Sequence, residues 1–162
     1  MKRRRLSKQK ITVYALFTIY SLVMLYLLFF QRLERDVDIP YLEYLKSSIN
    51  CIPFKTIINY SLDVKYGNGM SNLALKNLSG NILLFIPLGF FLPTIFKKLR
   101  KISRFLITVI SLIVAVEVIQ LLTMLGSCDI DDLIFNVLGA SIGFGIWKLK
   151  PIIKILRKYK IM

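Results

Sequence analysis

Four long apolar runs, separated by polar or basic stretches, dominate the sequence. They cover residues 11–30, 80–96, 105–125 and 130–149. A helix rises about 1.5 Å per residue, so roughly 20 residues cross the ~30 Å hydrocarbon core of a bilayer. The pattern therefore predicts an all-α fold: a polytopic membrane helical bundle of about four transmembrane helices, in a single domain over residues 1–162.

Two of these runs have an alternative interpretation. The first follows a basic head and resembles a signal peptide, but Phe29-Phe30-Gln31-Arg32 is not a small-residue cleavage site, so we favour an uncleaved anchor. The second is the shortest and contains Pro87, Gly89 and Pro93. Because a proline cannot donate its backbone hydrogen bond, we expect a kinked span there, with a re-entrant hairpin as the alternative.

The distribution of lysine and arginine predicts the orientation. The net charge of +14 would by itself suit a nucleic-acid-binding protein. The basic residues, however, concentrate at 2–10, 97–104 and 148–160, whereas the turn at 126–129 has none. Positive charge marks cytoplasmic segments. We therefore expect a multi-pass plasma-membrane protein with both termini cytoplasmic, attracted to anionic lipids, and no nucleic-acid partner.

This orientation leaves residues 31–79 outside the cell. Apolar residues recur through this segment, so we expect it to pack on the membrane surface. Residues 41–45 predict a short interfacial helix, and Gly67-Asn68-Gly69 predicts a turn. Cys51 and Cys128 both fall outside; we expect two unpaired cysteines, although a disulfide is conceivable there.

Glu117 is the only acid within the third run. An ionised carboxylate near the bilayer centre costs ~2.5–3.5 kcal/mol on insertion scales, so Glu117 must be protonated, paired or facing a wet cavity. Gln120 follows at i+3 and points the same way. Two interpretations stay open: a functional role, or interhelical hydrogen bonding that only holds the bundle together.

A stripe of polar and small residues runs along the fourth span. Asp129, Asp132, Asn136, Gly139 and Gly143 recur every three or four residues, which places them on one helix face. The two acids would stabilise the helix start whatever else they do. The two glycines allow another helix to approach closely, and could support a homodimer.

The predicted orientation places polar groups from three spans at one depth, in the outer leaflet. A convergent polar cluster in a membrane predicts a site for a cation, a polar headgroup or a ligand arriving from outside. The candidate site residues are Asn81, Glu117, Gln120, Asp129, Asp132 and Asn136. The residues assigned to helix packing or kinking are Pro87, Gly89, Gly139 and Gly143.

Signals of known catalytic chemistry are weak. The sequence has no histidine, no P-loop and no Gly-x-Ser-x-Gly or CxxC motif. Asp131-Asp132 with Asn136 faintly resembles an acidic cluster that holds Mg²⁺ on a diphosphate lipid, but a single cluster is unspecific. We assign no catalytic residue, metal ligand or cofactor, and favour a non-enzymatic protein while leaving an enzyme open.

Three motifs resemble the signature of VanZ-like membrane proteins. They are NILLFIPLGF at 81–90, EVIQ at 117–120 and DIDDLIFNVLG at 129–139. Ile52-Pro53-Phe54 also matches that family's loop before its second span. The matches run in the family's order from about residue 50 to 145.

This resemblance implies a small protein of four or five spans, without an inherited catalytic mechanism. The family's name-giving member is associated with resistance to teicoplanin, a lipid-tailed glycopeptide. Many members have an arginine before the acidic motif, where this chain has Ser127-Cys128. A fixed ion pair with Glu117 or Asp132 is then less expected here than a bound cation or a protonated acid.

Three functions are compatible with these observations. The first is a membrane factor that lowers glycopeptide susceptibility at the outer leaflet, contacting the antibiotic or a cell-wall lipid precursor. The second is a membrane enzyme that modifies a lipid or cell-wall precursor, with Glu117 and Asp132 as acid and base. The third is a small proton-coupled transporter or flippase subunit, with Glu117 as the proton carrier.

Overall fold

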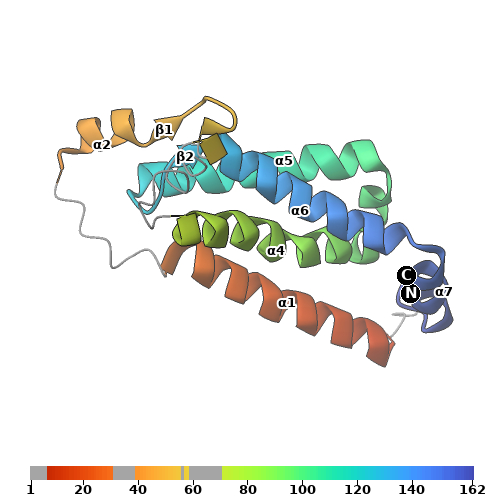
Figure 1. The fold of residues 1–162 in the computed structure, drawn as a ribbon. Helices are drawn as coiled ribbons and strands as arrows, with labels where there is room; N and C mark the ends of the chain where they lie inside the picture. The colour runs from red at the N-terminus through yellow and green to blue at the C-terminus, as the bar shows by residue number, and fades with distance from the viewer. Residues whose placement is uncertain (1–6, 31–38, 56, 59–70) are drawn as a thin grey trace.

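A computed structural model describes residues 7–30, 39–55, 57–58 and 71–162, and this part of the chain is mostly helical (Figure 1). Four helices are long and apolar enough to cross a membrane, as the apolar runs predicted. The elements, in chain order, are α1 Lys8–Phe29, α2 Tyr41–Ser47, β1 Ile49–Asn50, α4 Ser71–Ile95, the 3-10 helix η2 Lys97–Arg100, α5 Ile102–Leu122, β2 Cys128–Asp129, α6 Ile130–Lys148 and α7 Lys150–Lys158.

Helix α4 is continuous, although it contains Pro87 and Pro93. It begins at Ser71 rather than at residue 80. The additional helical turns contain polar residues, so the apolar run alone did not predict them. Near the first proline, the Tyr20 hydroxyl of α1 donates a 2.7 Å hydrogen bond to the Leu84 carbonyl. The helix thus continues through both prolines, and the chain does not form a hairpin here.

The pair α4 and α6 makes the most extensive contact between described elements. Glycine on both sides allows it: a Cβ at Gly89 would overlap the Ala140 carbonyl oxygen. Cβ atoms at Gly139 and Gly143 would overlap the carbonyl oxygens of Ile82 and Ile86, respectively. The glycines of α6 therefore pack within the chain, as helix-packing residues. The expectation that they could form a homodimer face is wrong for these two positions, because α4 already covers them.

Aromatic and branched side chains fill the centre of the bundle. Phe85, Phe105, Val109 and Ile113 are completely buried, and the rings of Phe105 and Phe144 stack with centroids 4.4 Å apart. Helix α1 lies along one side of α4 (Figure 1) and buries only Met24 and Leu28. Many apolar side chains elsewhere on α1 and α5 are exposed, as expected of helices surrounded by lipid.

The two ends of the bundle differ. At one end, β1 and β2 pair in parallel, Ile49 opposite Cys128, and α2 confirms the short helix predicted at residues 41–45. At the other end lies α7, an amphipathic helix that the sequence analysis did not identify, with the carboxyl-terminal residues beside it (Figure 1). The predicted turn at Gly67-Asn68-Gly69 lies outside the described residues, as do Lys2 to Arg5 of the basic head.

The contact between α4 and α6 yields a stability prediction. We expect Gly143→Ala to lower the free energy of unfolding by about 1–3 kcal/mol, because the added methyl group overlaps the Ile86 backbone. Gly145→Ala is the matched control: the same helix offers open space there, and alanine favours a helix by up to about 1 kcal/mol. Thermal unfolding in detergent measures both variants, and equal midpoints would contradict the proposed packing.

Candidate functional site

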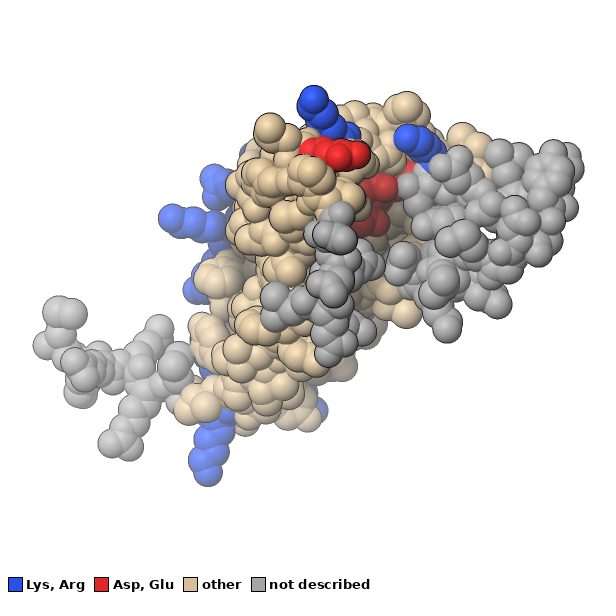
Figure 2. Space-filling model, turned by 90° about the vertical axis from the view of Figure 1, so that its left-hand side faces the viewer, with Lys and Arg blue, Asp and Glu red and all other residues tan. Residues whose placement is uncertain are grey.

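The candidate site lies at the end of the bundle that carries α2, β1 and β2 (Figure 1). Figure 2 views the molecule from this side and shows acidic side chains both at the surface and set back in a hollow. Among the residues described, the carboxylates of α5, β2 and α6 all belong to this end.

The turn between α5 and α6 positions the acidic motif. Helix α5 ends because the N–H groups of Leu125 and Gly126 both donate to the Gln120 carbonyl, at 2.9 and 3.2 Å, with Met124 in the left-handed conformation at φ 58°. The buried Tyr44 hydroxyl of α2 donates a 2.5 Å hydrogen bond to the Gly126 carbonyl. Helix α2 is thereby held against the turn that leads into the acids.

Asp129 joins β1 to α6. The Asn50 side-chain amide donates a 3.0 Å hydrogen bond to Asp129 Oδ1, beside the β1–β2 pairing. The same oxygen accepts from the Asp131 N–H at 2.9 Å, so Asp129 is the N-cap of α6, as predicted. The Asp129 carboxylate thus caps the amino terminus of α6 and also binds β1 to that helix.

Asp131 is a functional candidate that the sequence analysis did not assign. Its side chain is 1% exposed, and its Oδ1 accepts a 2.5 Å hydrogen bond from the Phe54 N–H. Phe54 has a φ of 64°, a left-handed conformation that is unfavourable for a bulky residue. The bond holds that turn against α6. Asp131 lies off the stripe of polar residues, and its place within the motif at 129–139 is the signal in the sequence that singles it out.

Asn81 and Asp132 meet between α4 and α6. The Asn81 amide donates a 2.5 Å hydrogen bond to Asp132 Oδ1. This hydrogen bond places the two groups at the same level of the bundle, as predicted. Their contact depends on the close approach of α4 and α6, since both side chains are short.

Gln120 connects α5 to α1. It is buried, and its amide donates a 2.8 Å hydrogen bond to the Leu28 carbonyl near the end of α1. That is the interhelical hydrogen bonding left open as an alternative. Asn136 is also buried on α6, with no hydrogen-bond partner for its Oδ1 among the described residues. Of the six predicted groups, Glu117 and Asp129 line one cavity, Asn81 and Asp132 bond to each other, and Gln120 bonds α1.

Glu117, 5% exposed, lines a small cavity together with groups of the outer segment. The cavity measures about 90 Å³, and its polar lining includes Asn50, Cys51, Cys128 and Asp129. Such a volume admits a few water molecules or one small polar group. Among the described residues, no three His, Cys, Asp or Glu side chains are placed to hold a metal ion.

The two cysteines beside this cavity are both free thiols. Burial raises the pKa of the Cys128 thiol above its usual value, and negative charge on Glu117, Cys51 and Asp129 raises it further. The pKa of the Cys128 thiol therefore depends on the charge around the cavity.

Known proteins resemble this chain over most of its length. The family model described as VanZ/LLP1 matches residues 17–153. Protein VanZ of Enterococcus faecium is similar, with 25% identity over 140 residues that cover 86% of this chain and 76% of that protein. No solved structure matches the chain.

The raised pKa of Cys128 gives a test of the charge on Glu117. In a Cys51→Ser background, we expect Glu117→Gln to lower the pKa of Cys128, because it removes a negative charge that disfavours the thiolate. At fixed pH below that pKa, alkylation by iodoacetamide then becomes faster, and the rate measured across pH shifts toward lower pH.

Glu43→Gln is the matched control for this experiment, since Glu43 is an exposed acid on α2 that does not line the cavity. It should leave the pH profile of Cys128 in place. An unchanged profile in Glu117→Gln would show that Glu117 carries no negative charge beside the cavity.

Proposed function

This chain belongs to the VanZ/LLP1 family, and we propose that it lowers the susceptibility of a Gram-positive cell to lipid-tailed glycopeptides such as teicoplanin. It acts at the outer leaflet of the cell membrane, without a chemical step on the drug. The similarity to Protein VanZ of Enterococcus faecium supports this assignment at a distance. The observation that carries it is the cavity of Glu117, Asn50 and Asp129 at the end of the bundle opposite η2 and α7.

The proposal includes an orientation with both termini in the cytoplasm. Lysine and arginine gather in η2, α7 and the start of α1, whereas the acids gather at the β1–β2 end. Positive charge favours the cytoplasmic side. The cavity then opens at the outer leaflet, the side from which an antibiotic arrives.

The outer segment suits a ligand with one apolar and one polar part. Leu42, Ile52 and Phe54 are exposed on the segment that covers the cavity, with Leu42 72% exposed. Apolar side chains beside a membrane surface insert among the lipid headgroups and acyl chains. A lipid-tailed glycopeptide would place its tail in the leaflet and its polar part against Asn50 and Asp129.

An enzyme with Glu117 and Asp132 as acid and base is less well supported by the geometry. Asp132 is hydrogen-bonded to Asn81 between α4 and α6, whereas Glu117 lines the cavity with Asp129. The two proposed partners therefore do not line one cavity. A changed lipid or precursor profile on deletion would favour the enzyme. A dependence on the proton gradient in vesicles would favour the transporter.

Expression in a susceptible Gram-positive host tests the proposed function. We expect the wild type to raise the inhibitory concentration of teicoplanin several-fold, and that of vancomycin less, because only teicoplanin is anchored by a lipid tail. Glu117→Gln and Asp132→Asn should abolish most of the shift, while Glu43→Gln should retain it. Membrane protein levels are compared by immunoblot. Absence of a teicoplanin shift from the wild type would reject the resistance role.

Cysteine labelling tests the orientation. Cys51 is exposed on the outer segment, so we expect a membrane-impermeant maleimide to label it on intact cells. In a variant without the two native cysteines, Lys154→Cys on α7 should be labelled only after the cells are permeabilised. The reverse pattern would contradict cytoplasmic termini.

A further inference from the structure

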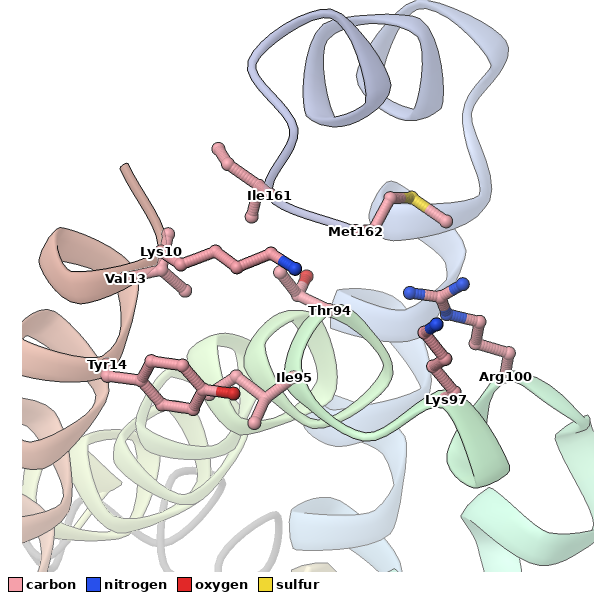
Figure 3. Close-up of a pocket in the computed structure, with 9 residues that line it drawn as sticks. All are labelled: Lys10, Val13, Tyr14, Thr94, Ile95, Lys97, Arg100, Ile161 and Met162. Carbon is pink, nitrogen blue, oxygen red and sulfur yellow. The ribbon is translucent and has the colours of Figure 1, made fainter. Parts of the chain in front are cut away.

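A second pocket lies at the basic end of the bundle, far from the Glu117 cavity. It measures about 140 Å³ and lies between the start of α1, the end of α4, η2 and the last residues of the described chain (Figure 3). Its charged lining consists of Lys10, Lys97 and Arg100, and it includes no Asp or Glu. Figure 3 shows these three side chains directed into one space, with Ile161 and Met162 above it.

The arginine of this pocket is held in place by the end of α4. Arg100 Nε donates a 3.1 Å hydrogen bond to the Pro93 carbonyl, close to the end of that helix. One of the five N–H donors of the guanidinium is thereby used, and the others are available to a ligand. Burial and the nearby Arg157 lower the pKa of Arg100, but an arginine stays charged at neutral pH.

Three cations around one small space repel one another unless an anion lies between them. The fork of a guanidinium matches the oxygens of a phosphate, and the two ammonium groups add charge without a geometric demand. Basic pockets between membrane helices are suited to anionic lipid headgroups. The charge and the donor set therefore favour a phosphate group as ligand.

An apolar groove adjoins this pocket. It measures about 640 Å³ and is lined chiefly by Leu92, Ile95, Phe96 and Leu99, with Thr108 of α5 across from them. The groove and the basic pocket share Ile95 and Lys97 in their linings. A ligand with a phosphate and an acyl chain could occupy both, whereas a soluble phosphate compound would leave the groove unused.

We propose that the basic end binds one anionic phospholipid, with its headgroup phosphate among Lys10, Lys97 and Arg100 and an acyl chain along the Leu92–Phe96 groove. This site is independent of the proposed function, because it shares no residue with the Glu117 cavity. A bound lipid places a negative charge among the three cations, which reduces their mutual repulsion, and fills apolar surface between α4, η2 and α5. It thereby stabilises the end of the bundle that carries η2 and the start of α1.

Native mass spectrometry of the purified full-length protein tests the proposal, with phosphatidylglycerol, phosphatidylcholine and inorganic phosphate as probes. We expect preferential retention of one phosphatidylglycerol. Lys10→Gln with Lys97→Gln should weaken it roughly 30-fold, since two cations that each contribute about 1 kcal/mol near a membrane surface are removed. Lys10→Arg with Lys97→Arg keeps both charges and should keep the binding.

Two further variants distinguish a site from diffuse charge. Lys150→Gln with Lys154→Gln removes the same charge from exposed positions of α7 that line neither space, and should leave binding little changed. Thr108→Phe fills the groove, and should weaken binding of the lipid but not of inorganic phosphate. Equal losses in the two double glutamine variants would overturn the proposal. Displacement of the lipid by inorganic phosphate, with no effect of Thr108→Phe, would also overturn it.

Discussion

The close approach of α4 and α6 is the constraint on which the rest of the structure depends. Gly89, Gly139 and Gly143 let backbone carbonyls of one helix reach the surface of the other, with no side chain between them. In a membrane, where water does not drive helices together, such packing supplies much of the association energy. The same proximity brings Asn81 within hydrogen-bond distance of Asp132, so the packing also assembles part of the candidate site.

At the acidic end, hydrogen bonds within the chain stabilise carboxylates that are costly to bury. Buried carboxylates require hydrogen bonds, and here the outer segment provides them: Asn50 donates to Asp129 and the Phe54 N–H donates to Asp131. These contacts also hold the segment in place, as does the hydrogen bond from the Tyr44 hydroxyl to the Gly126 carbonyl. Glu117 thus borders a small cavity with defined walls, and this arrangement underlies the proposed role at the outer leaflet.

The two ends of the bundle differ in the charged side chains that line their cavities. The acidic end holds its charges through hydrogen bonds within the chain, whereas Lys10, Lys97 and Arg100 converge on a space without an acid in its lining. The first arrangement satisfies its charges within the chain, and the second leaves three cations for the anionic lipid that we propose.

The amino-acid sequence by itself determined the helical class and the number of candidate spans, because length and apolar content decide what can cross a bilayer. It also located the acidic motif, and Asp129 as the cap of α6, because capping is a local interaction. The family followed from three short motifs, and the match over residues 17–153 confirms it. Only the tertiary structure decided that Gln120 bonds α1, that Asp131 holds the turn at Phe54, and that the α6 glycines face α4. Those contacts join residues far apart in the chain, and periodicity identifies a helix face without saying which neighbour covers it.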